Sequence, residues 1–296
     1  MMILLMLVPV LTWCQGQGGS SRDAEKQFWV TTQADSLLAE KILTGLKEYL
    51  AENENVSVAE LMVRAGKALA GQPYVAGTLD EKPADAAEED AWREEVRIYL
   101  TRTDCVVFVE TCLALARTAL EDGDFRMFAD EIRRSRYRGG RIGSYADRLH
   151  YTTEWGMQGE ERGVLKDVTE ELGGVPREHP VHYMSAHPGS YPLMDDIGAI
   201  RRAEDRINSH TRYYIPKNKL GKAMEGIRSG DIICLVTNVE GLDISHVMMA
   251  AVEDDGTVRP LHASTGPMKV VLDTRTLMEY LAAQSSVAGI QILRPI

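Results

Sequence analysis

The sequence contains few cysteines and fewer basic than acidic side chains. Only 4 of its 296 residues are cysteine, and Cys14, Cys105, Cys112 and Cys234 form neither a CxxC pair nor another metal-like cluster. No zinc site is therefore expected, and no other metal or cofactor is predicted. Lys and Arg total 33 against 44 Asp and Glu, a formal net charge of -11. This balance argues against a nucleic-acid-binding protein, because phosphate contacts need clustered Lys and Arg, but it does not exclude a small substrate that carries carboxylates.

Long apolar runs are also absent, except at the N-terminus. Residues 1–13 are mostly apolar, but this run is too short to span a bilayer comfortably and is typical of the apolar core of a secretory signal. No Lys or Arg precedes it, no small-x-small cleavage site follows it, and bulky Trp13 before Cys14 fits a lipoprotein cleavage box poorly. Residues 15–21, rich in Gln, Gly and Ser, are typical of a flexible tether. We interpret residues 1–21 as a signal or lipoprotein-type segment with a tether; the alternatives are an incorrectly assigned start and a short buried helix.

The remaining residues, 22–296, are predicted to form one domain, with a helical part over 22–70 and a core with inserted loops over 71–296. The second half of the chain is rich in strand signals. Strands are expected at 230–237, 245–252, 258–263, 270–272 and 289–293. Helices first and strands later indicate an α+β fold, with the helical part packed on an antiparallel sheet.

Two helices are predicted before residue 70. Apolar residues recur at helical spacing over 24–50 and again over 58–69. Ser57, with Glu60 three residues on, is a typical N-cap for the second helix. The stretch Gly-Gln-Pro-Tyr-Val-Ala-Gly at 71–77 should then break the helix and begin an extended turn.

The most informative stretch is Thr-Asp-Cys-Val-Val-Phe-Val-Glu at residues 103–110. It places Cys105 at the start of an apolar helix that Asp104 or Thr103 can cap. Unpaired backbone N–H groups in a first helical turn lower the pKa of a thiol and favour the reactive thiolate. Taken alone, a cysteine in an apolar helix is more often an inert core residue than a nucleophile.

Two histidines downstream supply the groups that a cysteine nucleophile needs. His246 and His262 are sixteen residues apart in a predicted hairpin that folds at 254–256, which places them nearly opposite each other. A ring-to-ring hydrogen bond is then feasible if both side chains face the same side, whereas a slip of one residue would separate them. A thiol, an imidazole base and a group that orients the base are the requirements of nucleophilic acyl transfer.

Several motifs resemble those of known cell-wall enzymes. The stretches 71–77 and 103–110, with Ser-His-Val at 245–247 and Leu-His-Ala-Ser at 261–264, resemble the NlpC-type, papain-like cell-wall hydrolases. A fuller set is similar to the N-acetylmuramoyl-L-alanine amidase-like family of bacterial envelopes, from about residue 60 to the C-terminus. That set comprises Pro-Tyr-Val-Ala-Gly-Thr-Leu at 73–79, Arg-Leu-His-Tyr at 148–151 with Trp155, Gly-Asp-Ile-Ile at 230–233 and Gly-Leu-Asp-Ile-Ser-His at 241–246.

The resemblance implies a papain-like fold with Cys105 as nucleophile, His246 as base and His262 as the orienting third residue. The backbone N–H of Cys105 is the natural oxyanion donor. Tyr74 matches a tyrosine that lines the site near the nucleophile, although ordinary packing against the turn would also explain it. Asp104 is interpreted as a helix cap, with a substrate-amine ligand as the second possibility.

Other polar and aromatic residues are candidate substrate contacts. His150, Tyr151 and Trp155 could form a wall against a sugar or peptide, with a packed loop as the alternative, and Ser245 precedes the predicted base. Three more histidines invite a metal interpretation, but their spacing is irregular and broken by proline, so they are interpreted as loop residues. These are His179, His182 and His187.

The predicted function is a cysteine hydrolase of peptidoglycan fragments, exported to the periplasm or cell envelope and either secreted or tethered to a membrane through its N-terminus alone. The resemblance favours cleavage of the amide between N-acetylmuramic acid and L-alanine, through a thioester. The alternative is an endopeptidase that cleaves the bond between D-glutamate and the diamino acid. Two other functions fit the sequence less well. A transglutaminase-like acyltransferase would more usually have Asp as its third catalytic residue. A binding module that keeps the fold without the chemistry would not need all three catalytic residue types.

Overall fold

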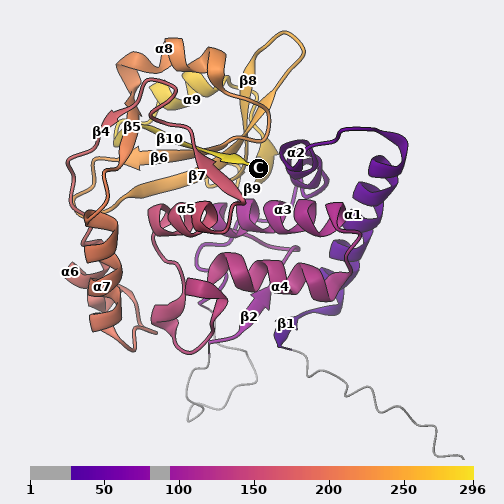
Figure 1. Ribbon diagram of the computed structural model, residues 1–296, viewed down its shortest axis with the longest axis horizontal. Helices are drawn as coiled ribbons and strands as arrows, with labels where there is room; N and C mark the ends of the chain where they lie inside the picture. Colours follow the sequence, from indigo (N-terminus) through magenta and orange to yellow (C-terminus); the bar gives the residue numbers. More distant parts are fainter. Residues whose placement is uncertain (1–27, 81–93) are drawn as a thin grey trace, which may run out of the picture.

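The computed structural model describes residues 28–80 and 94–296 (Figure 1). The segment interpreted as a signal and tether, residues 1–21, lies outside these ranges. Within them, no helix has both the length and the apolar character needed to cross a membrane. Helices combine with a large antiparallel sheet, so the predicted α+β class is confirmed.

The first elements are two helices and a small parallel sheet. Strand β1 (Trp29–Thr31) pairs with β2 (Val96–Ile98). Helix α1 covers Gln33–Glu52 and α2 covers Val58–Ala68. In Figure 1 these helices lie at one end of the molecule.

Side-chain caps determine where α1 and α2 begin. Thr32 has an extended backbone and its hydroxyl accepts the N–H of Asp35, so α1 starts at the next residue. The prediction of one helix over 24–50 is therefore wrong at its start, where β1 lies instead. Ser57 caps α2 as predicted, by accepting the N–H of Glu60 at 3.2 Å.

Three further helices lie on one side of the large sheet. They are α3 (Cys105–Leu120), α4 (Phe125–Arg136) and α5 (Thr152–Glu161). Helices α3 and α5 lie against the strands of the sheet, and α4 packs on α3. Helix α3 is central: 12 of its 16 residues are buried, so the body of the helix is held firmly against its neighbours. Glu110 of α3 and Arg136 of α4 form a buried ion pair at 2.6 Å, and removing either partner would leave an uncompensated buried charge.

The large sheet has the strand order β4-β5-β10-β6-β7-β8-β9, and β3 also pairs with β10. All of these pairings are antiparallel. The strands are β3 (Leu165–Asp167), β4 (Val175–Pro176), β5 (Tyr213–Pro216), β6 (Ile232–Thr237), β7 (Ile244–Val252), β8 (Val258–Ser264), β9 (Lys269–Leu272) and β10 (Val287–Pro295).

Apolar side chains cover both faces of this sheet. Val247 and Met249 of β7 belong to the core shared with helices α1 to α4, whereas Met248 belongs to a second core on the other face. This alternation follows from the two-residue period of a strand. The second core is closed by α8 (Leu220–Ala223) and α9 (Leu277–Ala282), which lie above the sheet in Figure 1.

The remaining elements are short or lie at one side. Helices α6 (Tyr183–Ala186) and α7 (Ile197–Asn208) pack together with the 145–151 region in a third, smaller core. Five single 3-10 turns complete the described structure: Arg138–Gly140, Tyr145–Asp147, Pro188–Ser190, Lys217–Lys219 and Met224–Gly226.

Candidate active site

Cys105 is the first residue of α3, and Asp104 is the N-cap of this helix. The Asp104 carboxylate accepts the backbone N–H groups of Val106 at 3.0 Å and of Val107 at 2.9 Å. The predicted cap is confirmed for Asp104 and not for Thr103, whose hydroxyl donates to the Asp104 carbonyl instead. The cap and the buried body of α3 therefore fix the position of the cysteine.

The turn that carries Tyr74 is fastened to the residue before this cap. Val75 donates its N–H to the Thr103 carbonyl at 2.9 Å, and Thr103 donates its own N–H to the Pro73 carbonyl at 3.0 Å. Burial raises the pKa of Tyr74 to about 12, and the negative charges of Cys105 and Asp104 add to this effect. Tyr74 thus pairs with Thr103, two residues before Cys105, and its hydroxyl is neutral at physiological pH.

The Cys105 thiol is partly exposed and lies against the middle of the sheet. The backbone N–H groups of Val247 on β7 and of Cys105 and Val106 at the start of α3 act to lower the pKa of this thiol. Burial nevertheless raises the pKa of the thiol to about 12, and the charge of Asp104 adds to the rise. The prediction of a lowered thiol pKa is therefore wrong, because loss of hydration outweighs the field of the helix end.

His246 and His262 come from the two strands of the β7–β8 hairpin. Strand pairing runs from Met249 with Leu261 to Val252 with Val258. In that register the histidines are diagonal neighbours offset by two residues, so the prediction that they lie directly opposite is wrong. Their side chains nevertheless share one side of the hairpin, because an even offset preserves the face.

The predicted ring-to-ring hydrogen bond is present. Nε2 of His246 and Nδ1 of His262 are 2.7 Å apart, with the ring planes at 78°. Burial lowers the pKa of His246 to about 3, and His262 contributes to the shift. Burial also lowers the pKa of His262 to about 4, against the opposing charge of Asp273. At neutral pH the site therefore holds a neutral thiol and two neutral imidazoles.

Three residues around His262 were not predicted from the sequence. Asp273 follows β9 and its Oδ2 lies 3.7 Å from Nε2 of His262. Arg275 binds the same carboxylate at 2.7 Å, and the ring of Tyr280 on α9 packs edge-on against His262 at 5.3 Å between ring centroids. No motif marks these residues, since only the pairing of β8 with β9 brings Asp273 to the histidine.

The predicted aromatic wall is largely buried at Tyr151 and Trp155. Tyr151 is 2% exposed, and its hydroxyl donates to Glu204 and accepts the N–H of Met184. Trp155 is 6% exposed and donates its indole N–H to Ser135. Both rings are core residues because α5 packs against the protein, although Trp155 also lines a narrow apolar hollow beside the candidate cysteine with Val106, Val109, Thr152, Ile232 and Val247.

The two other predicted substrate contacts, His150 and Ser245, lie in different surroundings. His150 is partly buried; its Nε2 is 2.8 Å from the Tyr145 carbonyl and its ring packs on the Tyr145 ring. Ser245 is exposed next to His246, and its hydroxyl donates to the Leu235 carbonyl at 3.3 Å. Of the two, only Ser245 lies directly beside a candidate catalytic residue.

Burial of His150 predicts a measurable effect of pH on stability. Its pKa is lowered to about 3 by burial and by the charge of Arg148, against 6.5 for an unperturbed histidine. The unfolded chain therefore binds a proton at His150 more tightly than the folded chain does. The stability that depends on neutral His150 is complete above pH 6.5 and is lost as the pH falls towards 3. In the wild type, this protonation should lower the free energy of unfolding by up to about 2 kcal/mol between about pH 6.5 and 4.5. The His150→Gln variant should lack this decrease.

Urea unfolding at several pH values checks this expectation, with His210→Gln, which replaces an exposed histidine, as the matched control. An identical pH dependence in the wild type and in His150→Gln would contradict it.

Two of the three loop histidines are bound to backbone carbonyls. Nε2 of His179 is 3.0 Å from the Val239 carbonyl, and Nδ1 of His187 is 2.8 Å from the Tyr183 carbonyl. In residues 28–80 and 94–296, no group of three or more His, Cys, Asp or Glu side chains is arranged to hold a metal ion.

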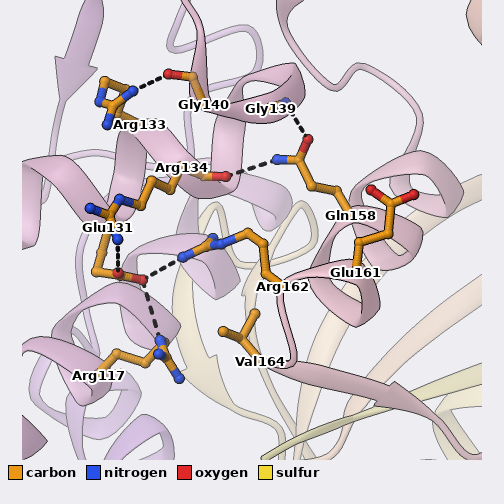
Figure 2. A pocket seen from close by; sticks show the side chains of 10 residues that line it. All are labelled: Arg117, Glu131, Arg133, Arg134, Gly139, Gly140, Gln158, Glu161, Arg162 and Val164. Atoms are coloured by element: carbon orange, nitrogen blue, oxygen red, sulfur yellow. Dashed lines mark hydrogen bonds and ion pairs between the residues drawn. The ribbon is translucent and has the colours of Figure 1, made fainter.

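A conspicuous hollow of about 500 Å³ lies away from Cys105, and Figure 2 shows its charged lining. Arg117 contributes to it from the other end of α3, twelve residues or about 18 Å along the helix from Cys105. Arg117 and Arg162 both bind Glu131, and Arg133 binds Asp130. The arginines are thus engaged by acidic neighbours, and we assign this hollow a structural role.

The sequence matches the N-acetylmuramoyl-L-alanine amidase-like (AmiA-like) family over residues 64–290. The chain belongs to this family. A crystal structure of an N-acetylmuramoyl-L-alanine amidase from Bacteroides uniformis is 31% identical and has a TM-score of 0.70, covering 81% of this chain and 99% of that one. Among curated proteins, none matches the sequence.

Two other solved structures are similar to this amidase-like chain. A Bacteroides fragilis protein, named provisionally as a xylanase, is 32% identical with a TM-score of 0.66, covering 77% of this chain and 98% of that one. A Legionella pneumophila protein is 20% identical with a TM-score of 0.62, covering 88% and 97%, and supports the fold alone. The family match includes every candidate residue of the amidase-like site, from Tyr74 to Tyr280.

Proposed function

We propose that this protein is a papain-like cysteine amidohydrolase that cleaves the amide between N-acetylmuramic acid and L-alanine in peptidoglycan fragments. One observation carries the proposal: a capped helix start places Cys105 on α3, which packs against β7, the strand that carries His246 of the His246–His262 hydrogen bond. Membership of the amidase-like family and the name of the Bacteroides uniformis relative support the choice of bond.

The proposed reaction begins from a neutral thiol and a neutral imidazole. A thiolate–imidazolium pair is not the resting state, because burial raises the pKa of the thiol and lowers that of His246. His246 therefore takes the Cys105 proton as the sulfur attacks the lactyl carbonyl carbon, which is general-base catalysis of a nucleophilic step. Nδ1 of His246 is the atom for this role, since Nε2 is engaged by His262.

The first half of the reaction ends in a thioester. Negative charge develops on the carbonyl oxygen, and the backbone N–H of Cys105 at the positive end of α3 is placed to stabilise it. His246 then returns the proton to the departing nitrogen of L-alanine, and the carbon–nitrogen bond breaks. The muramyl lactyl group stays on the sulfur as an acyl group.

Water completes the second half of the reaction. His246 takes a proton from a water molecule, whose oxygen attacks the thioester carbonyl, and the carbon–sulfur bond breaks. Cys105 recovers the proton, and the products are free N-acetylmuramic acid and a peptide that begins with L-alanine. Because burial keeps His246 neutral well below pH 6.5, it can accept both protons under mildly acidic conditions.

The proposal extends to the cellular location. The apolar run at residues 1–13 supports export to the periplasm or cell envelope, with attachment to a membrane only through the N-terminus. A substrate made of peptidoglycan fragments is consistent with that location.

The provisional xylanase name of one relative does not suggest a second function. Glycoside hydrolysis generally uses a pair of carboxylates on either side of the scissile bond. Near Cys105, the Asp104 carboxylate is occupied by the helix cap, and Arg275 occupies the carboxylate of Asp273. A thiol and two imidazoles favour acyl chemistry instead.

Digestion of defined muropeptides, followed by mass spectrometry, tests the proposed bond. N-acetylmuramoyl-L-alanyl-D-glutamyl-diamino acid should yield free N-acetylmuramic acid and a peptide headed by L-alanine. Release of the free diamino acid, leaving N-acetylmuramoyl-L-alanyl-D-glutamate, would support the endopeptidase instead. A heat-denatured sample of the same protein provides the control.

A further inference from the structure

The ring of His262 has one nitrogen without a hydrogen-bond partner. His262 is fully buried, and among the described residues its Nε2 is one of only four buried side-chain nitrogen or oxygen atoms with no such partner. A buried polar atom in this state is costly unless a charge lies nearby. The Asp273 carboxylate, 3.7 Å away, is that charge.

Asp273 is held in place and kept ionised. Its backbone N–H donates to the Pro260 carbonyl of β8 at 2.8 Å, which anchors it beside His262. The Arg275 guanidinium binds both carboxylate oxygens, at 3.0 and 2.7 Å, and its backbone N–H donates to the same carboxylate. These hydrogen bonds hold the pKa of Asp273 below its ordinary value. A fixed negative charge therefore faces Nε2 of His262 at neutral pH.

This charge determines where the proton of each imidazole lies. A carboxylate near Nε2 of His262 favours the tautomer with its proton on Nε2, which leaves Nδ1 as an acceptor. Nδ1 then accepts a hydrogen bond of 2.7 Å from the Nε2–H group of His246. His246 is thereby left with an unprotonated Nδ1, the form that can take a proton from Cys105.

The opposite tautomer would disable the site. With its proton on Nδ1, His262 would donate to Nε2 of His246, and the single proton of neutral His246 would sit on Nδ1. His246 could not then act as a base towards the thiol. The direction of the hydrogen bond between the rings therefore decides whether the neutral site is competent.

We propose that Asp273 is a positioning residue that sets the tautomers of His262 and, through it, of His246. It acts through His262 and touches neither the substrate nor the reacting sulfur. The inference rests on the proposed function for the role of His246 as base, whereas the tautomers themselves do not depend on any substrate. Arg275 supports the role by fixing the orientation of the carboxylate.

Nitrogen-15 NMR of the histidine rings tests the proposal without turnover. At neutral pH, wild-type His262 and His246 should each carry their proton on Nε2. In Asp273→Asn, which keeps the side-chain shape and removes the charge, the protons should move to Nδ1 of both rings. A proton on Nδ1 of His262 in the wild type would overturn the proposal, even if the variant failed to fold.

Turnover provides the second readout. Asp273→Asn should lower kcat about 100-fold and change KM less than about twofold, because the effect is on the base and not on substrate contacts. Asp255→Asn, at an exposed carboxylate of the β7–β8 turn, is the matched control and should leave kcat unchanged. Asp273→Glu, which restores the charge, should recover part of the lost rate.

The combined outcomes separate this inference from the proposed function. An Asp273→Asn variant that loses activity but keeps both protons on Nε2 would reduce Asp273 to a structural role and overturn the proposal, as would an unchanged kcat. If the wild type cleaves no muropeptide while the tautomers change as expected, the proposed function fails and the positioning role stands.

Discussion

Replacing Cys105 with serine is expected to lower muropeptide turnover at least about 1000-fold while the protein stays folded. A hydroxyl is a weaker nucleophile than a thiol and is harder to deprotonate. The oxygen is smaller than sulfur and the site is partly exposed, so little packing is lost. Product release measured by liquid chromatography and mass spectrometry reports the rate, and urea unfolding reports the stability.

Cys112 provides a matched control on the same helix. It is fully buried and burial alone raises its pKa, so it belongs to the core of α3. Cys112→Ser should lower the free energy of unfolding by about 1 to 3 kcal/mol, because it buries a hydroxyl in place of an apolar thiol. The folded fraction of that variant should turn over at the wild-type rate. Full activity in Cys105→Ser would end the assignment of the nucleophile.

Replacing His246 with alanine is expected to cost about 100- to 10,000-fold in kcat, the usual contribution of a general base. The site starts from a neutral thiol, so without His246 no described group takes its proton by the proposed route. Added imidazole should restore part of the rate, because the substitution leaves space for a free base. Turnover with and without imidazole, at saturating substrate, is the measurement.

His187→Ala is the control for His246→Ala, since it removes an exposed histidine from the α6 region. It should leave kcat unchanged. His262→Ala should also lower the rate strongly, with a larger loss of stability because His262 is fully buried. A His246→Ala variant as fast as the wild type would show that another group takes the thiol proton.

Local sequence signals predict the elements that build the site. Asp104 before an apolar run predicts the cap of α3, and the acidic, Gly-containing turn at 254–256 predicts the hairpin that carries both histidines. These predictions succeed because caps and tight turns depend on a few neighbouring residues. The start of α1 was predicted less well, since the apolar pattern gives no sign that residues 29–31 pair with β2.

Properties that depend on tertiary packing could not be predicted in this way. The helix start indicates a lowered thiol pKa for Cys105, but packing against β7 removes water from the sulfur and reverses the direction. The same limit applies to Tyr151 and Trp155, whose burial depends on how α5 docks. Asp273 carries no local signal at all, because only the β8–β9 register brings it to His262.

The central claim is that Cys105 forms a covalent bond to the muramyl lactyl group. Acid quenching during turnover, followed by proteolysis and mass spectrometry, tests this most directly. We predict that the peptide containing Cys105 gains the mass of the acyl group and that hydroxylamine removes it, as expected of a thioester. An acyl group found on a different side chain during turnover would contradict the account.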